Sequence, residues 1–270
     1  MIRDAGASNR VNWDVWAAVH GQDAYYDSAG LVAGADSLTD VERAGLAAAV
    51  GEVDGLDVLH VQCHIGFDSV SLARRGARVT GADFSTVALE KARDLARRCE
   101  VDVRFVEADA AALPPVLRDG FDLAYATVGI LCWIADVGAW MRSVASTLRP
   151  GGRLLLLDIH PLWQMVDTVD PLVLDFPYAF DGPHEFAASG SYAAEAEATT
   201  TVEFGHSLGE IVTAAVSAGL RVVRLDEHLD SPLDFGRGQA ADADGRYRFR
   251  VSGQLLPVLY TLIAERPPSE

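Results

Sequence analysis

The chain has 270 residues, half of them apolar, and a formal net charge of −17 at pH 7. Such a chain can bury one large core without metals or disulfides, and its acidity disfavours nucleic acid, whose phosphates need clustered lysine and arginine. With three cysteines at no metal-ligand spacing, no signal-peptide pattern and no apolar run of membrane-spanning length, we expect a cytoplasmic protein without membrane or metal partners.

The N-terminal residues carry rings in a pattern that is not that of a strand. These rings belong to Trp13, Trp16, His20 and Tyr26. We expect a helical lid over residues 1–36 and a main domain over residues 37–270. Thr39 and Glu42 then have the spacing of a capping box, which predicts a helix to about residue 50.

From residue 57 onward, apolar strands alternate with helices. The expected strands are 57–62, 78–82, 102–107, 121–126 and 153–159; the helices are 68–75, 86–98 and 136–148, with a turn at 149–152. Nearly continuous apolar strands are typical of a parallel sheet that is covered on both faces and joined by right-handed crossovers. This pattern predicts a doubly wound, Rossmann-like α/β fold.

The alternation is interrupted at residue 160 by a segment rich in proline and aromatic residues. We interpret about 161–205 as a substrate cap inserted after the fifth strand, with one strand at 199–204. Ser207 then caps a helix that runs to residue 218. Two last strands are expected at 221–226 and 256–264.

The turn after the first strand has an unusual composition for a nucleotide-binding loop. It contains one glycine, Gly66, while Gln62 and His64 stand where such a loop often has others. A pyrophosphate needs close approach to the backbone, which these side chains obstruct. The turn therefore favours a nucleoside ligand without phosphates.

Acidic residues follow the next two strands. Asp83 ends the second strand, where a carboxylate accepts hydrogen bonds from both ribose hydroxyls, and Phe84 and Ser85 come next. Asp109 and Ala110 follow the third strand, where a second acid and a backbone amide fit an adenine ring. Together these residues predict an adenosine slot.

In order and spacing, these motifs resemble those of the class I S-adenosylmethionine-dependent methyltransferases. The chain is similar to a small-molecule branch in which His-x-Gln-Cys-His-x-Gly, here residues 60–66, replaces Asp-x-Gly-x-Gly-x-Gly. The resemblance implies a seven-stranded sheet of order 3-2-1-4-5-7-6 with strand 7 antiparallel. It also implies S-adenosylmethionine as methyl donor and S-adenosylhomocysteine as product. The donor contacts that it implies are Tyr26, Gln62, Cys63, His64, Gly66, Asp83, Phe84, Ser85, Asp109, Ala110, Thr127 and Trp133.

Methyl transfer to a small metabolite is an in-line displacement that depends on alignment in a water-poor pocket. A general base is optional, and the candidates are His160 after the fifth strand and His206 before the next helix. The alternative for each is a structural role at the end of its element. Aromatic faces attract a sulfonium, and the expected substrate contacts are Trp13, Trp16, His20, Trp163 and Tyr178.

Two other functions fit parts of the pattern. One is an NAD-dependent oxidoreductase, which the missing Gly-x-Gly-x-x-Gly disfavours. The other is a protein of the same fold that binds S-adenosylmethionine without methyl transfer. The acceptor atom, oxygen, nitrogen, carbon or sulfur, stays open, as does the choice between a monomer and a homodimer.

Overall fold

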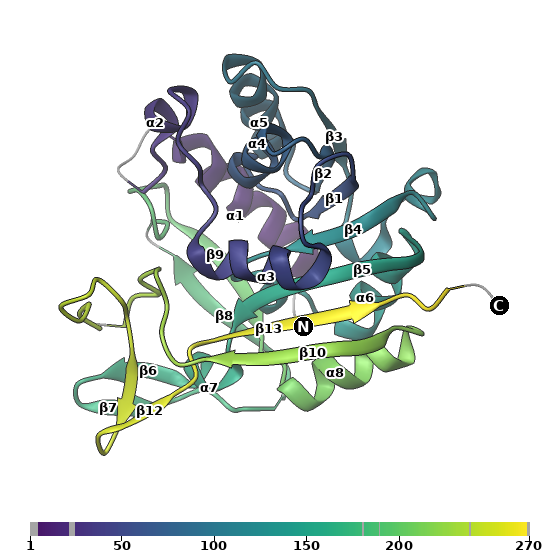
Figure 1. Cartoon of the computed structure of the whole chain (residues 1–270). Helices are drawn as coiled ribbons and strands as arrows, with labels where there is room; N and C mark the ends of the chain where they lie inside the picture. Colours follow the sequence, from purple (N-terminus) through teal and green to yellow (C-terminus); the bar gives the residue numbers. More distant parts are fainter. Residues whose placement is uncertain (1–4, 22–24, 180, 189, 238, 269–270) are drawn as a thin grey trace.

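The computed structural model describes residues 5–21, 25–179, 181–188, 190–237 and 239–268. Its centre is a seven-stranded sheet in the order β10-β13-β5-β4-β1-β2-β3 (Figure 1). The strands are β1 (Asp57–Val61), β2 (Arg78–Asp83), β3 (Val103–Glu107), β4 (Phe121–Ala126), β5 (Leu148–Ile159), β10 (Arg221–His228) and β13 (Leu259–Glu265). β13 is antiparallel to both β5 and β10, whereas the other neighbours are parallel. The predicted order is confirmed, with β10 as the sixth strand and β13 as the seventh.

Helices cover both faces of the sheet. They are α3 (Asp40–Val50), α4 (Phe67–Arg74), α5 (Thr86–Arg98), α6 (Val137–Ala145) and α8 (Leu208–Ser217). Val58 packs with residues of α3 and α4, whereas its neighbour Leu59 packs with α6 and α8. Because successive strand residues point to opposite faces, the continuous apolar pattern of the strands fills both layers.

Capping side chains explain where these helices begin. Glu42 N donates to Thr39 Oγ1 at 3.3 Å, and the Glu42 carboxylate accepts from the Thr39 backbone at 2.6 Å. The predicted capping box is thus confirmed. The Ser85 side chain caps α5 by accepting from the N–H of Ala88, and the Ser207 side chain caps α8 by accepting from the N–H of Glu210.

The junction between α6 and β5 differs from the prediction. α6 ends at Ala145, and the predicted turn at 149–152 lies within β5, which begins at Leu148. The carbonyl of Thr147 accepts from Gly120 and Phe121 at the start of β4, so these residues join the sheet instead of extending the helix. The extra residues form a bulge, because the β4–β5 register shifts between Phe121 and Leu123.

The N-terminal part consists of α1 (Ala5–Val19) and α2 (Ser28–Val32), and α1 lies beside β9 and α5. Lys91 on α5 is the only lysine in the chain. Its Nζ donates to the carbonyls of Ala18 and His20, each at 2.7 Å. Terminal helix carbonyls lack partners within the helix, so Lys91 both satisfies the end of α1 and holds it on α5.

The insertion after β5 contains a short helix and two hairpins. They are α7 (Pro161–Gln164), β6 (Val166–Val169) with β7 (Leu172–Leu174), and β8 (Pro183–Ala188) with β9 (Thr199–Phe204). The predicted strand at 199–204 is β9. Asn9 of α1 donates to the carbonyl of Val202 and accepts from its N–H, both at 2.8 Å. The boundaries of lid and cap stay predictions, and residues 1–4, 22–24, 180 and 189 within them lie outside the described residues.

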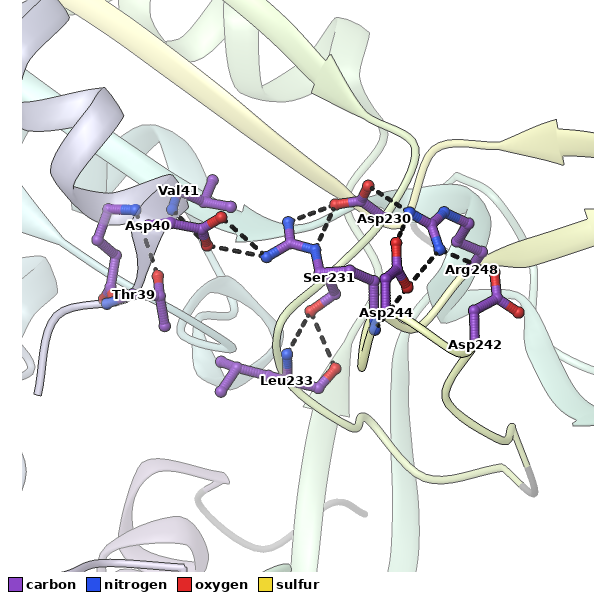
Figure 2. A network of polar contacts seen from close by, with 11 residues as sticks. Thr39, Asp40, Val41, Asp230, Ser231, Leu233, Asp242, Asp244 and Arg248 are labelled. Carbon is purple, nitrogen blue, oxygen red and sulfur yellow. Dashed lines mark hydrogen bonds and ion pairs between the residues drawn. The ribbon is translucent and has the colours of Figure 1, made fainter.

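A further hairpin, β11 (Phe249–Val251) with β12 (Gln254–Leu256), precedes β13, although the sequence analysis expects no strand between residues 226 and 256. Arginines and aspartates tie this region to the start of α3 (Figure 2). Arg246 pairs with Asp230 and, at 2.9 Å, with Asp40, while Arg248 pairs with Asp244 at 2.7 Å. The polar composition of this segment thus serves an ion-pair network.

Candidate functional site

The turn after β1 is built from left-handed residues. Gln62, His64 and Gly66 have φ values of 57°, 49° and 82°. The Gln62 side chain accepts from the Trp140 indole at 2.9 Å and donates to the carbonyl of Ile130 at 3.3 Å. Gln62 therefore joins the turn to α6 and the loop after β4, a role for which its sequence position gave no signal.

Close packing explains the single glycine of this turn. A Cβ on Gly66 would lie 2.8 Å from the Cβ of Ala92 on α5. Cys63 points toward β2, because a Cβ on Gly81 would lie 2.8 Å from its Sγ. Burial raises the pKa of the Cys63 thiol well above its usual value. The Cys63 thiol thus packs against β2, and the donor contact of Cys63 stays a prediction.

Asp83 lies at the centre of the predicted adenosine slot. Its carboxylate accepts from the backbone N–H groups of His64 at 2.8 Å and Ser85 at 2.9 Å. Burial raises its pKa to about 6, although the backbone hydrogen bonds act in the opposite direction. Asp83 thus links the β1 turn to the start of α5, with its carboxylate ionised at neutral pH.

The lid helix covers this end of the sheet. Asp14 of α1 accepts from Ser85 Oγ at 2.6 Å, and the Arg10 guanidinium lies 5.5 Å from the centre of the Phe84 ring. Arg10 also pairs with Glu107 of β3 at 3.0 Å. Helix α1 therefore packs over Phe84 and Ser85, the two predicted donor contacts.

Asp109 and Ala110 stand at the start of a 3₁₀ turn after β3. Asp109 is exposed, and its Oδ1 accepts from the N–H of Ala111 at 2.8 Å. Ala110 is buried. The adenine-binding role of these two residues stays a prediction.

The loop after β4 is held by an acid that the sequence analysis missed. Buried Asp158 of β5 accepts from the backbones of Gly129 at 2.5 Å and Leu131 at 2.9 Å. Burial raises its pKa against the effect of these hydrogen bonds. The position of Asp158 near the end of a central strand was the sequence signal that could have identified it as a site residue. The loop that it fixes carries Trp133, whose indole donates to the carbonyl of Gly129 at 2.9 Å.

Thr127 does not face the turn after β1. Its hydroxyl donates to buried Glu42 of α3 at 3.1 Å, beside the hydroxyl of Tyr125 on the same carboxylate at 2.9 Å. The Thr127 hydroxyl is thus bonded to α3, and a contact of this side chain with the methyl donor is not supported.

An aromatic cluster surrounds the His64 ring. We use this name for Trp13, Trp16, His20, Tyr26, His64, Trp133 and Tyr192. The Trp13 ring lies 5.0 Å from His64 and 5.3 Å from Trp133, centre to centre. The structure thus brings together α1, the turn after β1 and the loop after β4. Tyr192 of the insertion also belongs to the cluster, and the sequence analysis did not predict it.

Two buried donors in the cluster have no acceptor. Among the described residues, the indole nitrogens of Trp13 and Trp16 are buried and lack a hydrogen-bond partner. An unpaired buried donor costs about 1–3 kcal/mol, so a bound group with acceptor oxygens fits here. The carboxylate end of S-adenosylmethionine supplies such oxygens, and its sulfonium suits the ring faces.

A short chain of side-chain contacts runs through the cluster. His20 Nδ1 lies 2.7 Å from His64 Nε2, and His20 Nε2 lies 2.8 Å from Ser191 Oγ. Burial, with contributions from His20 and Lys91, lowers the pKa of His64 well below its usual value. The His64 imidazole is thus neutral at neutral pH.

The two histidines proposed as bases have other partners. His160 Nδ1 accepts from the N–H of Leu162 at 3.1 Å, and Nε2 lies 2.9 Å from Glu227 Oε1. His206 Nε2 lies 2.7 Å from the carbonyl of Ile134, and its Nδ1 faces Glu210 at 3.2 Å. A ring whose lone pair already caps α7 has none left for a substrate proton. We therefore do not keep His160 as the base, while a role of His206 as the base stays a prediction.

Trp163 and Tyr178 lie apart from the aromatic cluster. Trp163 is 1% exposed and packs on Phe249 at 5.3 Å between ring centres, within an apolar core of the insertion and β11. Tyr178 is 37% exposed. In the part of the chain that the structure describes, neither has a ring contact with the cluster. Trp163 is thus a core residue, and the substrate role of Tyr178 stays a prediction.

Two searches of the described residues bear on metals and membranes. They contain no group of three or more His, Cys, Asp or Glu side chains arranged to hold a metal ion. None of the helices within these ranges has both the length and the apolar character needed to cross a membrane.

Comparison with known proteins places this architecture. Residues 58–152 match the family described as methyltransferase domain. This segment, about a third of the chain, is similar to a methyltransferase domain. The match covers β1 to the start of β5 and thus includes the turn, Asp83 and Asp109.

Related proteins agree with this family. Methyltransferase GfsG of Streptomyces halstedii is 43% identical over 125 residues, 45% of this chain and 44% of that protein. Ubiquinone biosynthesis O-methyltransferase of Alkalilimnicola ehrlichii is 32% identical over 115 residues, 43% of this chain and 46% of that protein. The matched part thus spans less than half the length of either relative.

Solved structures share the fold over more of the chain. A methyltransferase from Mesorhizobium loti aligns with a TM-score of 0.56 at 21% identity, over 87% of this chain and 100% of that one. Magnesium protoporphyrin IX methyltransferase from Synechocystis, with bound S-adenosylhomocysteine, aligns with a TM-score of 0.55 at 18% identity, over 97% and 100%. At these identities the likeness concerns the fold.

Proposed function

We propose that this protein transfers a methyl group from S-adenosylmethionine to a hydroxyl group of a small metabolite. The observation that carries the proposal is the buried Asp83 carboxylate, fixed by the N–H groups of His64 and Ser85 beside the aromatic cluster. It supplies the acceptor for ribose hydroxyls at the end of β2. The family supports the donor, and the O-methyltransferase among the relatives supports the hydroxyl acceptor.

The proposed donor contacts follow the geometry. Asp83 would accept from the ribose, while Phe84 and Asp109 border the adenine. Gln62, His64 and Gly66 supply the turn beside the methionine end, with Trp13, Trp16, Tyr26 and Trp133 around it. When bound, S-adenosylmethionine supplies an electrophilic methyl group on sulfur. The chain contributes alignment and a water-poor, aromatic surround.

Isothermal titration with S-adenosylhomocysteine and S-adenosylmethionine tests the binding half. The wild type should bind at micromolar concentration. Asp83→Asn removes a charged acceptor worth about 1.5–3 kcal/mol and should weaken binding about ten- to a hundredfold. Asp175→Asn, the same change at an exposed carboxylate, is the matched control and should bind as the wild type does. Absence of wild-type binding would refute the proposal.

Transfer of label from methyl-tritiated S-adenosylmethionine to the low-molecular-mass fraction of a cell extract tests the chemical half. The labelled product should resist mild base if it is an ether and release methanol if it is an ester. Binding without any labelled product would instead identify a protein that binds the donor without methyl transfer.

A further inference from the structure

An arginine in the loop between β10 and β11 is partly buried and has no ion pair. Within the ranges that the structure describes, no carboxylate lies at ion-pair distance from the guanidinium of Arg237, and its side-chain N–H groups donate no hydrogen bond. Its guanidinium carbon lies 5.8 Å from the centre of the Phe176 ring. Charges taken out of water are normally paired or hydrogen-bonded, so this unpaired cation points to a missing partner.

The backbone of Arg237 is fixed on the insertion after β5. Its carbonyl accepts from the N–H of Val169 at the end of β6, at 3.4 Å. Its φ is 66°, a conformation that residues with a Cβ seldom adopt. Gln239, two positions further along, has a buried Nε2 without a hydrogen-bond partner among the described residues. This loop therefore carries a cation and an amide donor that described protein groups do not satisfy.

Two acids influence Arg237 without pairing with it. They are Glu203 of β9 and Asp167 of β6. Burial lowers the pKa of the Arg237 guanidinium, and the two acids act in the opposite direction. Burial also raises the pKa of Glu203, and Arg237 opposes that rise. Arg237 and Glu203 are thus close enough for their charges to interact, yet too far apart for an ion pair.

The loop after β4 connects this region with the aromatic cluster. β9, which carries Glu203, lies beside the 3₁₀ turn Leu131–Trp133. Burial raises the pKa of the Cys132 thiol in this turn, Glu203 adds to the rise, and Arg237 opposes it. The next residue, Trp133, belongs to the aromatic cluster. An acceptor that spans this turn would have one end at the aromatic cluster and the other at Arg237.

We propose, building on the function proposed above, that Arg237 binds a carboxylate group of the acceptor, remote from the hydroxyl that is methylated. A guanidinium donates two parallel hydrogen bonds to a carboxylate, and Gln239 carries a further donor on the same loop. One guanidinium beside Glu203 and Asp167 suits a monoanion, because a phosphate dianion needs more positive charge. The acceptor is therefore a hydroxy-carboxylic acid, and Arg237 selects it by charge.

The charge of the labelled product tests the substrate class. A cell extract is separated on an anion exchanger at pH 7, and each fraction is incubated with the protein and methyl-tritiated S-adenosylmethionine. The wild type should label compounds of the retained fraction. Because an ether keeps the carboxylate, the products should stay retained and resist mild base. Label confined to the unretained fraction, or products that are neutral esters, would overturn the proposal.

Substitutions of Arg237 test the residue itself. Arg237→Met should raise the amount of retained fraction needed for the half-maximal rate about ten- to a hundredfold. The maximal rate and the affinity for S-adenosylhomocysteine should not change. Arg237→Lys keeps the charge without the planar fork and should lie between the two. Arg118→Met, at an exposed arginine, is the matched control and should equal the wild type. Wild-type half-saturation of Arg237→Met would contradict the proposal.

A purely structural role for Arg237, as the counter-charge of Glu203, predicts a different result. In that case Arg237→Met would have no effect once Glu203→Gln has removed the acid. An arginine that binds the acceptor should instead give the same rise in half-saturation in both backgrounds. Equal half-saturation of Glu203→Gln with and without Arg237→Met would therefore refute acceptor binding by Arg237.

The outcomes separate the two proposals. A wild type that fails to bind S-adenosylhomocysteine or to label any fraction refutes the proposed function. A wild type that does both, with neutral products or with no effect of Arg237→Met, refutes the carboxylate site alone.

Discussion

Replacement of Gly66 by alanine should strain the β1 turn in two separable ways. Gly66 has φ +82°, and an added Cβ would lie 2.8 Å from Ala92 Cβ and 3.3 Å from Phe105 Cζ. The left-handed backbone costs an alanine about 1–2 kcal/mol, and overpacking of a rigid neighbour adds about 1–3 kcal/mol. Gly66→Ala should therefore lower the free energy of unfolding by about 2–5 kcal/mol.

Two other glycines separate the two contributions. Gly219 has the same φ of +82° but nothing within 4 Å of an added Cβ. Gly81 lacks a positive φ, but its Cβ would lie 2.8 Å from both Cys63 Sγ and Phe105 Cδ1. Gly219→Ala thus measures the backbone cost and Gly81→Ala the packing cost.

Urea denaturation at 25 °C, followed by circular dichroism, measures all three variants. The loss for Gly66→Ala should approach the sum of the other two, because each control isolates one contribution. If Gly66→Ala is no less stable than Gly219→Ala, the close approach of the turn to α5 does not limit this position. The reasoning about the single glycine would then be wrong.

Four further predictions follow from the site. Burial raises the pKa of Asp83 to about 6, and the ribose hydroxyls need the ionised carboxylate as acceptor. The affinity for S-adenosylhomocysteine should therefore hold above pH 7 and fall about tenfold per pH unit well below pH 6. The affinity of Asp83→Asn should show no such fall. Lys91→Met should raise amide hydrogen exchange in α1, since Nζ holds Ala18 and His20, while Arg98→Met on the same helix should not. His160→Asn should keep the α7 cap and transfer label at nearly the wild-type rate; a loss of about 10²-fold or more would restore His160 as the base. Trp163→Ala should cost about 3–5 kcal/mol in urea denaturation as a core residue, with donor affinity unchanged in the folded protein.

The fold could be predicted because its signals are local. Apolar runs defined β1 and β4 within a residue, and Ser85 and Ser207 marked the helix starts by chemistry that acts over three residues. The α6–β5 junction was predicted wrongly because the carbonyl of Thr147 accepts hydrogen bonds from the start of β4. Local helix propensity contains no information about such a pairing between distant residues.

The site could be predicted only in part. Strand ends located the β1 turn and Asp83, because parallel topology gathers them at one edge. Side-chain partners were not accessible in the same way: His160 has a plausible position for a base, but the N–H of Leu162 occupies the lone pair of its Nδ1. The contact of His20 with Ser191 joins residues 171 positions apart, and no sequence period reports such a meeting.

The bond between Asn9 and β9 has a consequence for the order of folding. Asn9 offers Val202 one donor and one acceptor, as a neighbouring strand would, yet the two residues are 193 positions apart. During synthesis at ~5–20 residues per second, α1 emerges ~10–40 s before the strand that it joins. The sheet from β1 to β5 can form in that interval. Helix α1 is therefore the first segment to be synthesised and among the last to pack in its final position. Nascent chains should bind the methyl donor only after β9 has left the ribosome.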